Sequence, residues 1–328
     1  MVDITLFGAT GFTGGLTADY LAVHLPAGAS WAIAGRTRSK LEQVAERIVA
    51  TGRPAPSIVI ADHRDAASMA AMAGGTRVLI STVGPYLKYG EPAVRAAAEA
   101  GIDYVDLTGE PEFVDRMWLA HHETAVRTGA RLVHACGFDS IPYDLGVLHT
   151  VEQLPADVPI TVRGYIRAKA AFSAGTYHSA IHQISRFRAS QSVARQRRER
   201  EPRPADRRVR GGGSIGRAVP PVRGFGVPLP TIDPQIVLRS ARALERYGPD
   251  FTYEHHAHFR TRRMMLAAAP ALGALAVGAM IPPAQGTAAA GQEPRRRAER
   301  GAARAVVVHA LARGGGRWTE GSDDGARR

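Results

Sequence analysis

The stretch LFGATGFTGG, Leu6–Gly15, places three glycines between an apolar run and a helical pattern. Gly8 stands where a first strand ends and the chain turns, Gly11 lets a phosphate approach the backbone, and Gly14 lets the helix pack closely on the strand. The N-terminus of that helix offers free N–H groups and a positive dipole end to a pyrophosphate. We therefore predict a dinucleotide site formed by Gly8, Ala9, Thr10, Gly11, Phe12, Thr13 and Gly14. A glycine turn without a ligand is the alternative.

Short apolar runs alternate with helical patterns over the first part of the chain. We expect strands at residues 3–7, 30–34, 57–61, 77–82, 104–107 and 132–135. We expect helices at residues 14–25, 39–50, 66–73, 91–100 and 111–128. Strands that alternate with helices in this way form right-handed βαβ units around a parallel sheet. The predicted fold class is α/β: an N-terminal Rossmann doubly wound parallel sheet, then a second α/β or α+β substrate domain.

The stretch AIAGRTRSK, which ends the second expected strand and continues beyond it, favours NADP(H) as the cofactor. An NAD site usually has Asp or Glu here to bind the ribose 2′-hydroxyl, whereas this chain has Arg36, with Arg38 and Lys40 close by. Cations at this place suit a 2′-phosphate, and Arg36 is the first choice for that contact, ahead of Arg38. The alternative is that these cations belong to a solvated helix start.

The fourth expected strand ends in STVGPY, at the sheet edge where such folds bind ligands. We expect Thr82, Val83, Gly84 and Pro85 to line the cofactor there, although Gly84–Pro85 is also an ordinary turn signal. Asp62, after the third strand, is a weaker candidate for a place near the adenine.

Composition and charge limit the possible partners. The chain has 328 residues, a net charge of +12 and one cysteine, Cys136, which excludes an intramolecular disulfide and a cysteine zinc cluster. The lone cysteine fits a reducing compartment, and we expect a cytoplasmic protein. Arg186–Arg223 holds twelve arginines against three acidic residues. We expect a mobile, solvated loop or a docking surface for an acidic partner there, and no nucleic acid, because no aromatic residues are interleaved for base stacking.

The last fifth of the chain changes in character. Met264–Ile281 carries no charge and reaches the lower limit for a membrane span, but it is rich in Ala and Gly and contains Pro270. We expect a buried or surface-docked helix, with shallow membrane or lipid contact as an alternative. Beyond residue 284 Ala, Gly and Arg dominate, so we expect a strand at 305–309 in an otherwise poorly ordered tail. The expected domains are 1–140, 141–284 and 285–328.

Several motifs together resemble the saccharopine dehydrogenase-like family of NADP-dependent reductases. They are FGATGFTG, AGRTRSKL, STVGPYLKYGEP, YVDLTGE and CGFDSIPYDLG. The segments Gly175–Arg186 and Leu229–Tyr253 look like the second domain of actinobacterial trans-acting enoyl reductases. The resemblance implies NADPH-dependent reduction of the carbon–carbon double bond of a polyketide or fatty-acyl thioester, in cell-envelope lipid synthesis. It also implies an acyl carrier protein or polyketide synthase as partner, which Arg195–Arg210 could steer.

Enoyl reduction needs a group that polarises the thioester carbonyl and a proton donor. The candidates are Tyr86, Tyr143 and His178. Asp139–Ser140 more simply caps the helix that begins near Pro142. No histidines have metal-ligand spacing, because adjacent histidine pairs point to different sides of a helix or strand.

Two other functions stay open. One is reduction of an imine or keto substrate of the saccharopine type, for which Arg163 and Arg167 could hold a carboxylate. The other is a non-catalytic NADP-binding scaffold.

Overall fold

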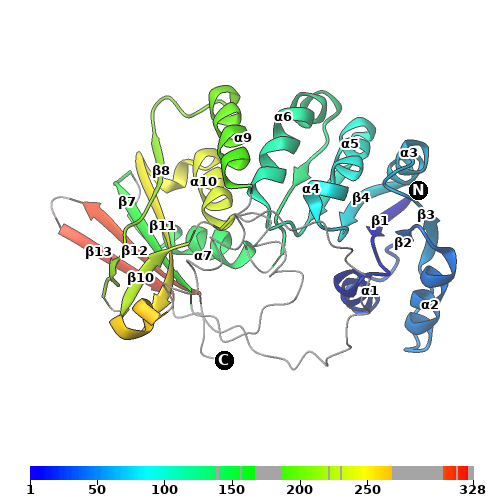
Figure 1. Ribbon diagram of the computed structural model, residues 1–328, viewed down its shortest axis with the longest axis horizontal. Helices are drawn as coiled ribbons and strands as arrows, with labels where there is room; N and C mark the ends of the chain where they lie inside the picture. Colours follow the sequence, from blue (N-terminus) through cyan, green and yellow to red (C-terminus); the bar gives the residue numbers. More distant parts are fainter. Residues whose placement is uncertain are drawn as a thin grey trace, which may run out of the picture. The chain divides into compact units, whose positions relative to one another are not determined.

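The computed structural model describes residues 1–137, 140–155, 157–166, 186–220, 222–229, 231–267, 306–314 and 317–323. They fall into two compact units (Figure 1). The first unit is drawn from Met1–Phe138 and Gln191–Arg200, and the second from Asp139–Ser190 and Glu201–Arg328.

The first unit is built on a six-stranded parallel sheet with the strand order β3-β2-β1-β4-β5-β6. Its strands are β1 Val2–Phe7, β2 Trp31–Gly35, β3 Ser57–Ile60, β4 Thr76–Ser81, β5 Asp103–Asp106 and β6 Leu132–Val133. Its helices include α1 Phe12–His24, α2 Arg38–Val49, α3 Ala66–Gly74, α4 Tyr86–Tyr89, α5 Glu91–Ala100 and α6 Pro111–Thr128. The order reverses between β1 and β4, which is the ligand-binding switch point of a doubly wound fold. The predicted Rossmann class is confirmed.

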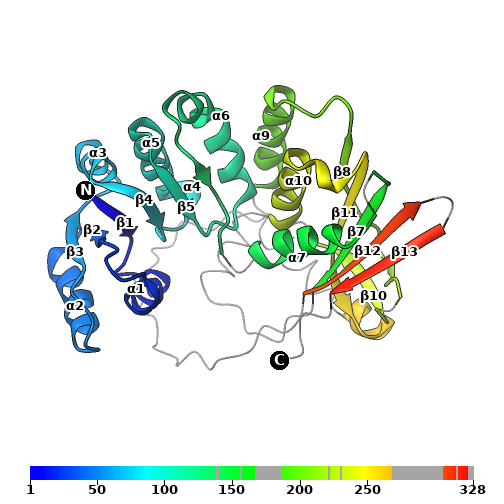
Figure 2. The same cartoon turned by 180° about the vertical axis from the view of Figure 1, so that it is seen from behind.

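Helices cover both faces of this sheet (Figures 1 and 2). On one face α1 and α2 bury Ala18 and Leu41 against Leu6 and Ile33 of the sheet. On the other face α3, α5 and α6 form a separate core around Tyr104. Because both faces are buried, the strands are nearly continuous apolar runs, and this pattern made them recognisable in the sequence.

The arginine-rich stretch is not the mobile loop expected from its sequence. It contains helix α9, Phe187–Arg200, and the strands β8 Arg208–Gly212 and β9 Gly216–Arg217. The C-terminal part of α9 belongs to the first unit, where Arg197 is buried 2.9 Å from Asp115 of α6 and lies over the Trp118 ring. The expectation of a loop was wrong because it rested on the number of arginines alone. The helix and strands are held by acidic partners far away in the sequence, such as Asp115.

The second unit contains a mixed sheet with the order β13-β12-β7-β11-β10-β9, and β8 pairs with β11. The strands not yet given are β7 Ile160–Ile166, β10 Phe225–Pro228, β11 Asp250–Phe259, β12 Val306–Gly314 and β13 Arg317–Asp323. Its helices include α7 Ile141–Glu152, α10 Asp233–Ala243 and the 3-10 turn Glu245–Tyr247. β7 runs parallel to β11, whereas β12 pairs antiparallel with both β7 and β13. A second, mixed α/β unit was expected and is present.

Two strands, β12 and β13, lie within the segment 285–328, and the rest of that segment is outside the described residues. The strand expected at 305–309 is present as β12 and is longer, and its backbone pairs with β7 in the register Ala310↔Val162. Composition alone does not show that β7 offers a partner strand.

The two faces of the second sheet differ in chemistry. Along β7 and β11 successive side chains point to opposite faces. One face packs Val162 and Tyr253 against Val147 of α7 and Val237 of α10. The other face carries polar and charged residues, among them Arg163, Glu254 and His256.

Part of the expected apolar helix lies outside the described residues, since only Met264–Ala267 of Met264–Ile281 are described. Among the helices that the structure does describe, none is both long enough and apolar enough to cross a membrane.

Candidate cofactor and active site

The three glycines of the turn have different reasons to be glycine. Gly8 has φ +94°, and a Cβ there would lie 2.8 Å from Thr82 Oγ1. A Cβ on Gly14 would lie 2.1 Å from the Gly8 carbonyl oxygen. A Cβ on Gly11 would meet only that same oxygen, at 3.4 Å. The fold therefore requires Gly8 and Gly14 but does not require Gly11, so the open space there fits a bound phosphate.

The N-terminus of α1 is open to an anion. Gly11 is its N-cap residue, no side chain caps the helix, and its first turn contains no acidic residue. The first N–H groups of a helix have no partner within the helix, and they carry the positive end of its dipole. Phe12 at this end is 68% exposed, so the turn is accessible. This arrangement can bind a phosphate.

Arg36 follows β2 directly and is exposed, as are Arg38 and Lys40 at the start of α2. In the described part of the chain no salt bridge engages any of these three cations. They are therefore available to a 2′-phosphate. The Asp62 carboxylate already accepts hydrogen bonds from Arg64, the shortest at 2.7 Å. These bonds hold the pKa of the Asp62 carboxyl well below its ordinary value.

Thr82–Pro85 lies at the carboxyl end of β4, beside the glycine turn. The Thr82 N–H and hydroxyl both donate to the Phe7 carbonyl, at 2.9 and 3.1 Å. Gly84–Pro85 is a cis peptide bond. The structure thus brings Gly8 and Thr82 together, as the sequence predicted for one edge of the sheet.

Glu110 shapes this edge, and sequence reasoning did not identify it. Its buried carboxylate accepts the backbone N–H groups of Tyr86 and Leu87, at 3.0 and 2.9 Å, and so caps α4. The available signal was the TGE motif between β5 and Pro111.

Tyr86 is a structural residue by its contacts. Its hydroxyl donates to the Ser81 carbonyl at 3.0 Å, and the side chain is only 6% exposed. Burial raises the pKa of this phenol far above its ordinary value, with a smaller effect from Asp106. These contacts favour a structural role over the catalytic one that the sequence suggested.

A buried Asp–His pair lies at the carboxyl edge, and the sequence analysis missed it. Asp106 ends β5 and its carboxylate lies 2.7 Å from His134 Nδ1, just after β6. The same carboxylate accepts the Tyr104 hydroxyl and the N–H groups of Thr108 and Ala135, each at 3.0 Å. Ala135 adopts φ +60°, a strained conformation that persists where the surroundings hold it. The sequence signal for this pair was an acidic residue at the end of one strand and a histidine directly after the end of another.

Tyr143 lies in the second unit, in a buried polar cluster. Its ring meets the His255 ring edge-on at 4.9 Å, and Tyr253 Oη lies 2.9 Å from His255 Nδ1. Ser140 donates to Asp233 at 2.9 Å and does not cap α7 with its side chain, so the capping prediction was wrong for Ser140. The hydroxyl of Ser140 is engaged by Asp233, which lies 93 positions further along the chain, so the local sequence did not show this contact. Asp139, Arg167 and His178 lie outside the described residues.

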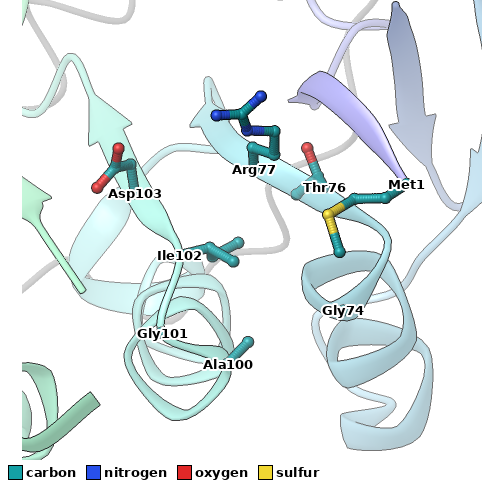
Figure 3. A pocket seen from close by; sticks show the side chains of 8 residues that line it. All are labelled: Met1, Gly74, Thr76, Arg77, Ala100, Gly101, Ile102 and Asp103. Carbon is teal, nitrogen blue, oxygen red and sulfur yellow. The ribbon is translucent and has the colours of Figure 1, made fainter. Parts of the chain in front are cut away.

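A recess in the first unit lies away from the expected cofactor site. It measures about 290 Å³ and lies at the amino ends of β4 and β5, whereas the glycine turn follows the carboxyl end of β1. Figure 3 shows Arg77 and Asp103 on these neighbouring strands. Both side chains are engaged, Arg77 with Asp3 and Asp103 with Arg131. Within the described residues, no three His, Cys, Asp or Glu side chains are grouped to hold a metal.

The chain is similar to several known proteins. Residues 4–133 match the model of the saccharopine dehydrogenase NADP binding domain. Over 190 residues the chain is 43% identical to a Mycobacterium tuberculosis protein named as a trans-acting enoyl reductase, covering 56% of this chain and 44% of that protein. It is 36% identical to a saccharopine dehydrogenase-like oxidoreductase of Arabidopsis thaliana, with 62% and 47% covered.

A solved structure, apo saccharopine dehydrogenase (L-Glu forming) of Saccharomyces cerevisiae, aligns with a TM-score of 0.43 at 15% identity, over 57% of this chain and 41% of that one. The chain spans less than half the length of the two curated relatives.

Proposed function

We propose that this chain is an NADPH-dependent enoyl reductase, because residues 4–133 match the saccharopine dehydrogenase NADP binding domain. It acts in trans on the carbon–carbon double bond of a polyketide or fatty-acyl thioester for cell-envelope lipids. The glycine turn carries the proposal, because Gly11 is the one glycine of the three that the fold does not require. The enoyl group as the point of reduction follows the names of the relatives, which are trans-acting enoyl reductases. The acyl thioester and the cell-envelope lipids are what the resemblance of the sequence motifs implies.

The cofactor contacts follow from the geometry of the turn. The first N–H groups of α1 hold the pyrophosphate, and Arg36 holds the 2′-phosphate. The segment Thr82–Pro85 lines the cofactor further along the same edge. When bound, NADPH supplies the hydride that the β-carbon of the enoyl group takes up.

His134 is our candidate for moving the proton to the α-carbon. Its Nδ1 lies on the Asp106 carboxylate, which fixes the ring and its tautomer and leaves Nε2 for proton exchange. Tyr143 and His178 remain candidates for polarising the thioester carbonyl. The variant His134→Gln should lower kcat at least about tenfold and leave the NADPH Kd unchanged, whereas His149→Gln, on an exposed position of α7, should change neither.

The partner surface is smaller than the sequence suggested. Within Arg195–Arg210 four arginines are engaged: Arg195 with Glu199, Arg197 with Asp115, Arg210 with Asp250, and Arg207 with carbonyls at the end of α10. Arg198, Arg200 and Arg203 are exposed and can meet an acidic carrier protein. Replacing these three by Ser should weaken turnover of carrier-bound substrate most at low salt.

The test is NADPH oxidation with the crotonyl thioester of N-acetylcysteamine. We expect oxidation coupled to formation of the butyryl thioester, and none with the butyryl thioester itself. Oxidation only with a 2-oxo acid plus an amine would favour a saccharopine-type reductase. Tight NADPH binding without oxidation by either substrate would favour a non-catalytic scaffold.

A further inference from the structure

We propose that the polar face of the second sheet holds a binding site for a small α-hydroxy carboxylate. A recess of about 170 Å³ lies there, on the face of β7 and β11 opposite to the apolar core. Its lining includes Arg163, Tyr165, Arg217, Glu254 and His256. An engineered protein cavity of about 150 Å³ admits benzene, so this recess accommodates a small organic anion.

His256 supplies a buried hydrogen-bonding atom that has no partner. The residue is 3% exposed, and in the described part of the chain its Nδ1 forms no hydrogen bond. The ring stacks on Tyr165 with centroids 5.4 Å apart, so its orientation is fixed. Burial lowers the pKa of the imidazole, while the Glu254 charge and then a backbone hydrogen bond with Ser214 raise it less. A neutral ring that donates one N–H to a carbonyl leaves the other nitrogen as an acceptor, so Nδ1 calls for an O–H or N–H donor.

The charged side chains around this atom call for an anion. Arg163 Nε donates to Glu254 Oε2 at 2.7 Å, which neutralises that pair. Arg217 is exposed, and within the described residues no carboxylate pairs with it. With His256 neutral, the recess carries one uncompensated positive charge. Arginine binds carboxylates with a planar set of N–H donors.

The two requirements together select the ligand class. A carboxylate on Arg217 satisfies the charge, and a hydroxyl on the adjacent carbon can donate to His256 Nδ1. Tyr165 adds a donor, since its oxygen already accepts the Val219 N–H at 3.0 Å and its own hydrogen remains to be donated. A zwitterionic amino acid brings no net negative charge and fits less well. A simple carboxylate lacks the donor and leaves Nδ1 unpaired.

This site lies within the second unit and is independent of the proposed reductase activity. It contains none of the residues assigned to the cofactor. Its test therefore uses binding alone, without NADPH.

The experiment is calorimetric titration of the full chain with L-lactate, propionate and L-alanine. We expect saturable lactate binding within about 10 mM, with propionate and alanine each about tenfold weaker. The lactate–propionate difference isolates the hydroxyl, and the lactate–alanine difference isolates the net charge. Failure of lactate to saturate, or equal affinity for lactate and propionate, would overturn the proposal.

Two variants and one control locate the site. His256→Phe keeps the ring that lies on Tyr165 and should make lactate and propionate bind alike. Arg217→Ala, at an exposed position, should weaken both ligands about tenfold. Arg208→Ala, an exposed arginine on β8 that does not line the recess, should change neither affinity. Equal losses in Arg217→Ala and Arg208→Ala would mean general charge attraction and would also overturn the proposal.

Discussion

Replacing Gly11 and Gly14 by Ala, one at a time, separates the ligand role of the glycine turn from its structural role. At Gly14 the new Cβ would lie 2.1 Å from the Gly8 carbonyl oxygen and 2.7 Å from the Gly8 carbonyl carbon. These are backbone atoms, so the helix or the strand must move. We expect a loss of about 3 kcal/mol in the free energy of unfolding, at the upper end for overpacking.

At Gly11 the same substitution should cost little stability. Its nearest contact would be the Gly8 oxygen at 3.4 Å, and its φ of −80° is accessible to Ala. Alanine is a poorer N-cap than glycine, by about 0.5–1 kcal/mol. The lower entropy of the unfolded chain offsets about 0.4–1 kcal/mol of this. The net change should be close to zero, while the methyl group occupies the space intended for the pyrophosphate.

Urea unfolding and NADPH fluorescence titration measure the two effects. We expect Gly11→Ala to unfold like the wild type but to bind NADPH at least about tenfold more weakly. For Gly14→Ala we expect the reverse: its main effect should be a loss of stability in urea unfolding, not a direct loss of NADPH affinity. If Gly11→Ala keeps full NADPH affinity, the reasoning about the turn is refuted.

Three further predictions follow from the contacts. Tyr86→Phe should cost about 1–2 kcal/mol of unfolding free energy, because the backbone partners of the hydroxyl stay buried without it, and kcat should not change. A large fall in kcat at unchanged stability would instead support a catalytic role for Tyr86. Asp115→Ala should destabilise the protein in urea unfolding, by up to about 3–5 kcal/mol, because it removes the carboxylate that lies 2.9 Å from the buried Arg197 guanidinium. Adding Arg197→Met should recover part of that loss, and no recovery would contradict the pairing. Cys136 should react slowly with iodoacetamide at pH 8, with a rate that rises through about pH 11, because burial and then the Asp106 charge raise its pKa to about 11; fast alkylation at pH 8 would contradict this.

The alternating strands and helices of residues 2–133 could be predicted from the sequence. They follow clear apolar runs and glycine breaks, and the structure places them within a few residues of the expected bounds. Helix α4 and the C-terminal part of α9 were not expected, and the last strand was expected to reach Ala135 but ends at Val133. Ala135 leaves the strand conformation with φ +60° and directs its N–H to Asp106. A tertiary hydrogen bond ends that strand, and local pattern does not show it.

The site could be predicted only where its residues are close in sequence. The glycine turn and Arg36 are local signals. The cap that Glu110 forms on α4 joins residues 24 positions apart, and the Asp106–His134 pair joins residues 28 apart. The buried Arg197–Asp115 pair spans 82 positions. Such pairs depend on which strand ends and helices become neighbours, so their residues looked like ordinary surface charges in the sequence.

The most direct test of the central claim is titration of NADPH and NADH into the wild type, Arg36→Asp and the control Arg53→Asp. Arg53 is an exposed arginine in the segment before β3. We expect the wild type and the control to prefer NADPH by about 10–100-fold, as a charged hydrogen bond to a phosphate provides, and Arg36→Asp to lose that preference. Equal binding of NADPH and NADH by the wild type, or an unchanged preference in Arg36→Asp, would contradict the assignment of this site.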